Sequence, residues 1–183
     1  MKKLLNSELE RKSLEDFKKA QKLPVVLVLD NVRSLSNVGS IFRTADAFLI
    51  QSICLCGITA CPPHRDIQKT ALGATESVDW SYYKETSQAI HELRGKGFQV
   101  ISIEQVEKST FLDDFQPDHK QKYAFVFGHE VRGVDQAIVD LSDTSIEIPQ
   151  YGIKHSFNIS ISAGIVLWDY HLKTKSNKKG AVK

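Results

Sequence analysis

The sequence of 183 residues has no hydrophobic run long enough to cross a membrane or to act as a secretion signal. Its first residues, MKKLLNSELERKS, include two lysines, but charges at Glu8, Glu10 and Arg11 interrupt the segment at once. Neither sign of charge is in large excess, because 24 Lys and Arg residues nearly balance 22 Asp and Glu residues, leaving a net charge of +2. We therefore expect a cytoplasmic protein that is no polycation, although basic residues can still gather locally.

Cysteine is scarce, with only Cys54, Cys56 and Cys61. An odd number of cysteines without a secretion signal favours free thiols over disulfides. Cys54 and Cys56 lie two residues apart in an apolar segment, so they share one face of a strand and serve as small hydrophobic residues. The alternative is a metal site with His64, but zinc sites use paired C-x-x-C spacings. We expect no metal.

Two phosphate-binding motifs are missing as well. No G-x-G-x-x-G follows the first predicted strand and no P-loop occurs, which argues against a dinucleotide-binding enzyme or an NTPase. Hydrophobic residues make up 42% of the chain, and its length suits one domain with a sizeable core.

Apolar patterning alternates between two periods along the chain. Short runs rich in Val, Ile and Phe predict strands over 25–29, 52–56, 78–83, 98–103, 123–127 and 144–148. Helical spacing predicts helices over 6–22, 38–49, 88–94, 136–141 and 158–172, with Ser7 and Glu10 as a capping box for the first and Asn37 as N-cap of the second. This alternation predicts an α/β fold, a mainly parallel sheet flanked by helices.

The chain divides into three parts on this pattern: an N-terminal helical extension (1–23), a central domain (24–172) and a basic tail (173–183). The tail contains five lysines and no acidic residue, and we expect either a solvated terminus or a phosphate contact. Its lysines are Lys173, Lys175, Lys178, Lys179 and Lys183.

Glycine and polar residues concentrate after three predicted strands, in segments 30–43, 128–133 and 149–158. Ligands of parallel sheets bind beyond the carboxyl ends of the strands, so these segments indicate one site. The first contains N-x-G-x-x-x-R from Asn37 to Arg43, and the second contains G-x-E-x-x-G from Gly128 to Gly133. The third has I-P at 148–149 followed by S-x-N at 156–158. Each element alone also fits a helix cap, a turn or a surface ion pair.

Together and in this order, the three elements resemble the SpoU (TrmH-like) family of RNA ribose 2'-O-methyltransferases, within the SPOUT superfamily. The resemblance covers residues 24–172, with local departures at Gln150, where the family often has Met, and at Phe157, where Leu is common. It implies a deep C-terminal trefoil knot, S-adenosyl-L-methionine as cofactor and RNA as substrate. It also implies a homodimer whose active site draws on both protomers.

The resemblance also implies site residues. Gly128, Ile148 and Phe157 would line the cofactor, with Glu104 as a further candidate. Arg43 would act on the ribose hydroxyl, either as a base or, because arginine stays protonated, as a cation that stabilises the developing alkoxide.

Four further residues complete the predicted catalytic set. Asn37 would orient the ribose or Arg43, and Glu130 would fix Arg43 or a neighbouring loop. Ser156 and Asn158 would shape the turn where cofactor meets substrate.

Alternatives remain at three points. The fold could bind RNA without catalysis, although the intact motifs argue against it. Transfer RNA is favoured over ribosomal RNA, because the chain has no room for a separate N-terminal RNA-binding domain. His155 is a second candidate base since histidine titrates near neutrality, and His64 with Arg65 reads as an exposed loop.

Overall fold

The computed structural model describes residues 1–5, 8, 9 and 11–180, with side chains up to residue 175. The capping box expected at Ser7 and Glu10 lies outside the described residues. Helix α1 spans only Leu14–Lys19, much less than the predicted 6–22. It begins at Ser13, whose Oγ accepts the N–H of Asp16 at 3.0 Å, and ends because Ala20 adopts an extended conformation.

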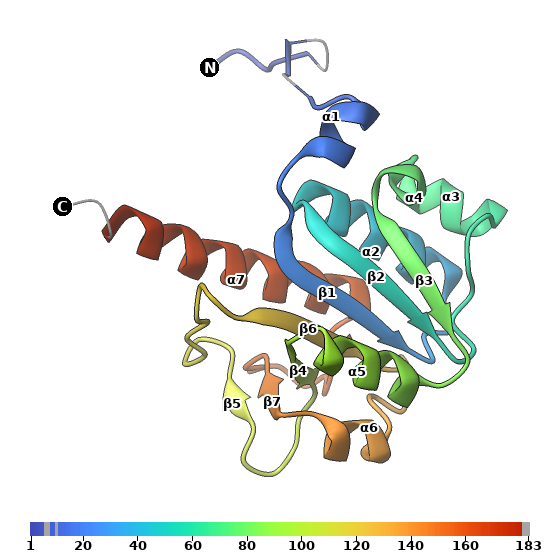
Figure 1. The fold of residues 1–183 in the computed structure, drawn as a ribbon, viewed down its shortest axis with the longest axis vertical. Coiled ribbons are helices and arrows are strands. Elements are labelled where there is room, and N and C mark those ends of the chain that lie inside the picture. The colour runs from blue at the N-terminus through green and yellow to red at the C-terminus, as the bar shows by residue number, and fades with distance from the viewer. Residues whose placement is uncertain (6–7, 10, 181–183) are drawn as a thin grey trace.

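The strands of the described residues form one seven-stranded sheet in the order β3-β2-β1-β6-β4-β7-β5 (Figure 1). All pairings between these described strands are parallel, which confirms the predicted α/β class. The strands are β1 (Leu23–Asp30), β2 (Ile50–Cys56), β3 (Asp79–Tyr83), β4 (Phe98–Ile103), β5 (Thr110–Phe111), β6 (Lys122–Phe127) and β7 (Thr144–Glu147).

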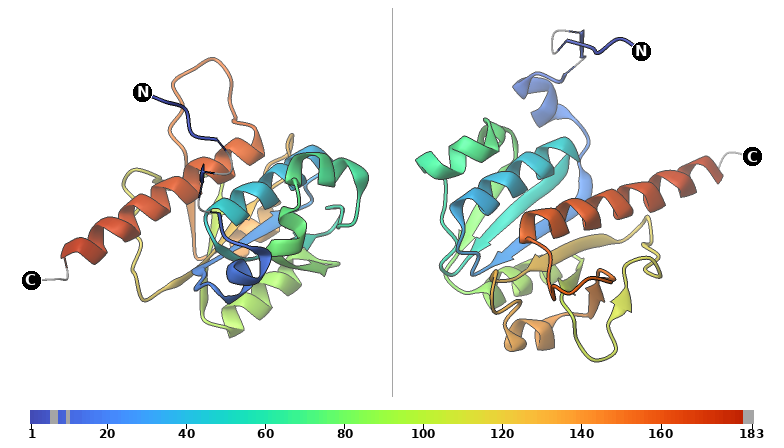
Figure 2. Two further views of the ribbon diagram at one scale, coloured as in Figure 1. Left: turned by 90° about the horizontal axis from the view of Figure 1, so that it is seen from above. Right: turned by 180° about the vertical axis from the view of Figure 1, so that it is seen from behind.

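Helices cover both faces of this sheet, giving three layers (Figure 2). One core cluster joins the sheet to α1, α2, α3, α4 and α7, and the other joins it to α5 and α6. The bounds of the remaining helices are α2 (Leu35–Ala47), α3 (Arg65–Ala71), α4 (Ala74–Ser77), α5 (Thr86–Gly95), α6 (Gln136–Leu141) and α7 (Ile159–Gly180).

Strand β1 lies inside the sheet between β2 and β6, and residues 25–30 are all buried. Leu27 and Leu29 face the first core cluster, whereas Val26 and Val28 face the second. This two-sided burial explains why the sequence shows a continuous apolar run rather than an alternating one. Because β1 ends at Asp30, the polar residues that follow it lie at the carboxyl edge of the sheet.

Helix α2 begins at a different residue from the one predicted. Its N-cap is Ser34, whose Oγ accepts the N–H of Asn37 at 3.3 Å, so the assignment of Asn37 as N-cap was wrong. Asn37 instead lies in the first turn and its side chain is buried. Two residues later, a Cβ on Gly39 would overlap Thr70 Oγ1 and the Ile67 carbonyl of α3. The motif glycine therefore lets α2 and α3 pack at backbone distance.

The structure contains elements that the sequence did not predict. Helices α3 and α4 and the two-residue strand β5 are short and mostly polar, so apolar periodicity gives no signal for them. His64, expected in an exposed loop, is exposed but also caps α3, because its Nδ1 accepts the N–H of Asp66 at 3.2 Å.

The last helix continues beyond the predicted end at Leu172. Helix α7 includes residues 173–180, which the sequence assigned to a basic tail. Lys173 is anchored rather than solvated, because its Nζ donates to the Leu112 carbonyl at 2.6 Å and lies 2.8 Å from Asp169 Oδ2.

The cysteines occupy the positions expected of small hydrophobic residues. Cys54 and Cys56 are buried in the second core cluster, and all three thiols are free. Burial raises the pKa of the Cys54 thiol to about 12 and also raises the pKa of the Cys56 thiol. Among the described residues, no three His, Cys, Asp or Glu side chains gather closely enough to hold a metal ion. No described helix has the length and apolar character needed to span a membrane.

Candidate active site

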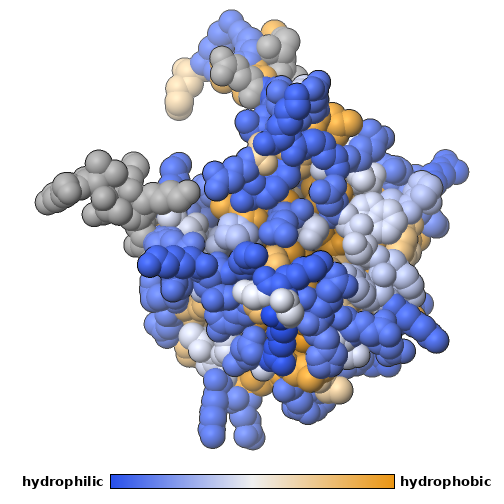
Figure 3. All heavy atoms as spheres, viewed as in Figure 1, coloured by the Kyte–Doolittle hydropathy of each residue, from blue (hydrophilic) through white to orange (hydrophobic). Residues whose placement is uncertain are grey.

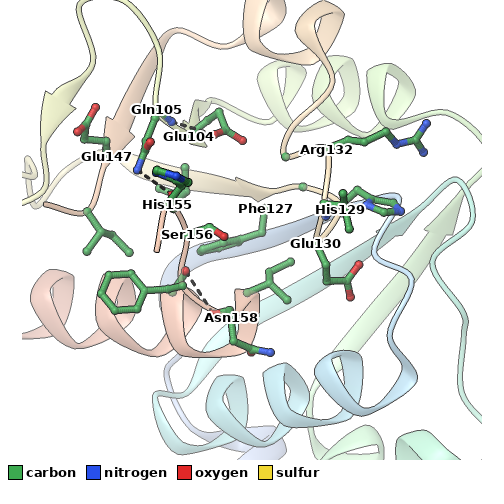
Figure 4. A pocket seen from close by; sticks show the side chains of 18 of the residues that line it. Glu104, Gln105, Phe127, His129, Glu130, Arg132, Glu147, His155, Ser156 and Asn158 are labelled. Atoms are coloured by element: carbon green, nitrogen blue, oxygen red, sulfur yellow. Dashed lines mark hydrogen bonds between the residues drawn. The ribbon is translucent and has the colours of Figure 1, made fainter. Parts of the chain in front are cut away.

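A cavity of about 540 Å³ opens beyond the carboxyl ends of β4, β6 and β7 (Figure 4). The loop after β6, the segment after β7 and the start of α7 form its walls, so the second and third sequence motifs meet here. Of the predicted site residues, it is lined by Glu104, Gly128, Glu130, Ile148, Ser156, Phe157 and Asn158.

The glycine loop after β6 is closed by its own backbone. The N–H of His129 donates to the Gly133 carbonyl at 2.9 Å, and the N–H of Gly133 donates back to the His129 carbonyl at 2.8 Å. A Cβ on Gly128 would overlap the carbonyl group of Gly133, and Gly133 itself has a φ of +69°. Both ends of G-x-E-x-x-G therefore require glycine, and the closed loop presents its backbone to the cavity.

Glu104, at the end of β4, holds this loop from the side. Its carboxylate accepts the N–H of Val134 at 2.9 Å and the N–H of Gln105 at 2.9 Å. A Cβ on Gly133 would overlap the same carboxylate. Glu104 therefore fixes the glycine loop besides lining the cavity.

Three side chains connect the three motifs, and we call Asn158–Asn37–Glu130 the amide bridge. Asn37 Nδ2 donates to Glu130 Oε1 at 2.9 Å, and Asn158 Nδ2 donates to Asn37 Oδ1 at 3.1 Å. Asn158 Oδ1 accepts the N–H of Ser160 at 2.9 Å, so Asn158 caps α7. Asn37 is only 8% exposed. Its amide is engaged at both ends within the protein, rather than presented to a ligand.

Glu130 makes two further contacts with the start of the first motif. It accepts the N–H of Arg33 at 3.0 Å and the N–H of Ser34 at 2.9 Å. Burial alone would raise the pKa of Glu130, but the hydrogen bonds from Asn37, Ser34 and Arg33 lower it below its ordinary value. Of the two partners considered for Glu130, the structure places it against the neighbouring loop.

Arg43 lies apart from this cavity. It is exposed and sits six residues after Asn37 on α2, which corresponds to about 9 Å along the helix axis. Instead of the first cavity, Arg43 lines a second one of about 750 Å³, between the segment around α1 and helices α2 and α4. The described chain by itself therefore does not bring Arg43 to the other predicted site residues.

The loop of residues 149–158 projects from the body of the molecule (Figure 2). Tyr151 and Ile153 are 96% and 93% exposed, and Phe157 is partly exposed. Gln105 Nε2 donates to the His155 carbonyl at 3.4 Å, which links the loop to β4. His155 lines the cavity but has no side-chain hydrogen bond to any described residue.

The first cavity combines apolar walls, a backbone cradle and more carboxylates than arginine or lysine side chains. Its volume is typical of small-molecule sites, which span roughly 300–1,000 Å³. Ile148 and Phe157 supply apolar walls, and Gly128 supplies a backbone cradle that a side chain would fill. Three carboxylates line the cavity against one arginine; they belong to Glu104, Glu130 and Glu147, and the arginine is Arg132.

Three residues of the site were not predicted from the sequence. Ser34 lies three residues before Asn37, which is the spacing of a side-chain cap, so this signal was available. Arg33 contributes only a backbone N–H, and Glu147 reaches the cavity only because β7 pairs with β4. No local sequence pattern predicts the role of Arg33 or of Glu147.

Comparisons with known proteins identify relatives of this chain. The model of the SpoU rRNA Methylase family matches residues 24–168. The 23S rRNA (guanosine-2'-O-)-methyltransferase RlmB of Neisseria meningitidis is 28% identical over 144 residues, which cover 79% of this chain and 56% of that protein. The chain spans 56–63% of the length of curated relatives such as this one.

Solved structures share the fold. The A. aeolicus TrmH/SpoU tRNA modifying enzyme superposes with a TM-score of 0.78 at 24% identity, covering 90% of this chain and 82% of that one. An AdoMet-bound rRNA methyltransferase from Sinorhizobium meliloti gives a TM-score of 0.75 at 27% identity, covering 85% and 60%. With the family model matching most of its length, the chain belongs to the SpoU rRNA Methylase family.

Proposed function

We propose that this chain transfers a methyl group from S-adenosyl-L-methionine to the 2'-hydroxyl of a ribose in structured RNA. The amide bridge is the observation that supports it most directly, because it joins the three motif segments around one cavity. Membership of the family and the likeness to a 2'-O-methyltransferase support the same reaction.

The cofactor, when bound, supplies a methyl group already activated on a positively charged sulfonium. In our proposal the closed glycine loop at Gly128 and the apolar side chains of Ile148 and Phe157 hold it, while Glu104 keeps the loop in place. The carboxylates of the cavity favour a cationic ligand through the Coulomb interaction. The AdoMet-bound relative supports this choice of cofactor.

We assign Arg43 to the ribose hydroxyl, which must lose its proton as it attacks. Arg43 is exposed, and in our proposal it stabilises the developing alkoxide as a cation, while the hydroxyl proton leaves to solvent water. Ser156 and Asn158 shape the turn beside the reacting groups. Asn37 and Glu130 act through the amide bridge, as positioning residues.

Because Arg43 does not line the first cavity of its own described chain, we propose a symmetric homodimer in which each active site combines residues of both protomers. The face in Figure 3 is mostly hydrophilic, with apolar side chains only in small areas. Helix α7, in front when the molecule is seen from behind (Figure 2), exposes apolar side chains instead. They are Ile161, Trp168 and Leu172, and we place the interface there.

Three finer points belong to the same proposal. The C-terminal part of the domain, 24–172, is threaded as the deep trefoil knot that the family resemblance implies. The substrate is transfer RNA rather than ribosomal RNA; the likeness to a tRNA modifying enzyme supports it, whereas the rRNA relatives favour the alternative. The enzyme works in the cytoplasm, where both RNAs occur.

Calorimetry with S-adenosylhomocysteine, after treatment with a chelator, tests cofactor binding without a metal. Transfer of labelled methyl groups to bulk transfer RNA and ribosomal RNA, followed by mass mapping of the ribose, tests the reaction and substrate. Binding and ribose methylation are the expected results. Cofactor binding without methylation of either RNA would favour an RNA-binding protein of the same fold. Absence of heat with folded protein would overturn the proposal.

A further inference from the structure

We propose that the second cavity binds the sugar-phosphate backbone of the substrate RNA, next to the ribose that is methylated. We call this cavity the N-terminal cleft; its lining includes Arg11, Lys12, Phe17, Arg43, Asp46 and Glu76. The inference rests on the proposed function, because Arg43 is the residue that links the cleft to the reaction. It assigns a substrate-binding role to residues 11–17, which precede the domain.

The cleft exists because the N-terminal segment packs on the domain at a defined place. Phe17 of α1 is buried in the core cluster that contains α2 and α4. Lys22 Nζ lies over the Phe17 ring, 3.4 Å from its centroid, and also donates to the Phe17 carbonyl. Arg11 and Lys12, just before α1, thereby line the same cleft as Arg43 on α2.

The cations of the cleft are available to a ligand. Arg11, Lys12 and Arg43 are exposed, and none forms an ion pair with a residue that the structure describes. Lys22 adds a further positive charge behind Phe17. Burial lowers the pKa of Lys22; the charges of Asp79 and Asp46 oppose this lowering, and those of Lys18 and Lys12 add to it.

The acidic residues of the cleft do not cancel these charges. The Asp46 carboxylate accepts the hydroxyl of Ser77 and lies close enough to Lys22 to oppose the lowering of its pKa. Glu76, the other acidic lining residue, is exposed on α4. Three cations therefore line the cleft against two carboxylates, which leaves an excess of positive charge.

The two cavities have linings of opposite sign. Three carboxylates and one arginine line the cofactor cavity, whereas three cations and two carboxylates line the N-terminal cleft. A cationic methyl donor suits the first and a polyanion suits the second, since phosphates are gripped mainly by Lys and Arg side chains. Arg43 belongs to the cationic lining. The reactive ribose hydroxyl and the neighbouring phosphates therefore belong to one RNA strand that runs along the cleft.

Charge reversal in the full chain tests the inference. Arg11→Glu and Lys12→Glu change two cleft cations, and Lys19→Glu is the matched control, because Lys19 is an exposed α1 residue paired with Glu15 outside the cleft lining. Each cleft variant should raise the RNA KM about fivefold at physiological salt and reduce the salt slope of binding by about 1. The kcat and the affinity for S-adenosylhomocysteine should stay unchanged, and Lys19→Glu should match the parent.

Two other outcomes would overturn the inference. Equal effects of all three variants would mean that only the net charge of the N-terminal segment matters. Unchanged RNA binding, with an altered sedimentation coefficient in the cleft variants, would mean that the cleft contacts a second copy of the chain. Failure of the proposed function is distinguishable, because the parent protein would then methylate no RNA.

Discussion

Asn158 donates its side-chain N–H to Oδ1 of Asn37 across 121 residues of sequence, at 3.1 Å. Through this contact the start of α7 and the first turn of α2 share one hydrogen-bond network with Glu130. Two asparagines and one glutamate of the family motifs therefore fix one another. Their role in our proposal is to fix the position of helix α2 relative to the cofactor cavity.

Asn37→Asp tests the amide bridge. The substitution keeps the shape but places a second carboxylate against Glu130 and removes the buried donor, so we expect the free energy of unfolding to fall by about 1–3 kcal/mol. Urea titration measures the loss. Gln88→Glu, the same chemical change at an exposed position of α5, is the control and should stay within about 0.5 kcal/mol of the parent. An unchanged free energy of unfolding for Asn37→Asp would contradict a structural role for the amide bridge.

The lowered pKa of Glu130 predicts a pH dependence of stability. As the pH falls, Glu130 takes up its proton first in the unfolded state, at the ordinary Glu pKa of about 4.3. In the folded state its hydrogen bonds stabilise the carboxylate, so protonation needs a lower pH. The contribution is complete above the unfolded pKa and disappears as the pH falls through the lower folded value. Urea midpoints of the parent and Glu130→Gln measured from neutral pH to pH 3 should converge toward the acid end. Parallel curves would refute the assignment.

Gly128→Ala should abolish cofactor binding. The new methyl group would overlap the Gly133 carbonyl, so the closed loop must open, whereas a Cβ on Gly152 meets no atom within 4 Å. Gly152→Ala is therefore the matched control, in the loop of residues 149–158 that borders the cavity. We expect no detectable calorimetric signal with S-adenosylhomocysteine for Gly128→Ala and near-parental affinity for the control. Normal binding by Gly128→Ala would show that the loop does not hold the cofactor.

Arg43→Ala should reduce kcat by about 10²–10³ and leave the cofactor affinity unchanged, because our proposal assigns cofactor binding to the Gly128 loop and to Ile148 and Phe157 rather than to Arg43. Arg43→Lys separates two roles of the side chain. Substantial recovery with lysine indicates a simple positive charge, and equal loss in both variants indicates the planar guanidinium geometry. Near-normal turnover of Arg43→Ala would leave Arg43 as a surface residue only.

Mixing inactive protomers tests whether the site is shared. In an equal mixture of Arg43→Ala and Gly128→Ala subunits, half of the dimers are hybrids, and each hybrid has one site with both residues intact if Arg43 serves the partner. We expect recovery of about a quarter of the parental activity for freely exchanging dimers. Each variant alone supplies the baseline. A mixture that remains inactive, with exchange verified, would place both residues in the same protomer's site.

The sequence predicted the parts of the fold whose burial is two-sided or strictly periodic. Val25–Leu29 lies within β1 and Phe98–Ile103 coincides with β4, because apolar runs between turn residues leave few alternatives. The order of the strands was beyond reach, since β1 pairs with β6 through contacts distant in sequence. Helices α3 and α4 were missed because they depend on packing against α2 rather than on their own pattern.

The site residues likewise divide into those with a local sequence signal and those whose position depends on the fold. Gly128 and Glu130 were identifiable because the motif spacing itself is distinctive, and both line the cavity. The N-cap assignment of Asn37 was wrong because asparagine favours caps on average, while Ser34 already occupied that position. The separation of Arg43 from the cofactor cavity depends on the direction in which α2 leaves the sheet edge, and local sequence does not encode it.

The strand order also determines when each part can form during synthesis. Strands β1, β2 and β3 are complete once residue 83 has emerged, but the free edge of β1 pairs only with β6, whose residue Tyr123 lies opposite Val25. The nascent chain must therefore keep a buried-type strand edge exposed while about 40 more residues are translated, which lasts roughly 2–8 s at ordinary elongation rates. The cofactor cavity closes later still, with Asn158. Chains terminated before β6 will present an unpaired, hydrophobic edge and aggregate.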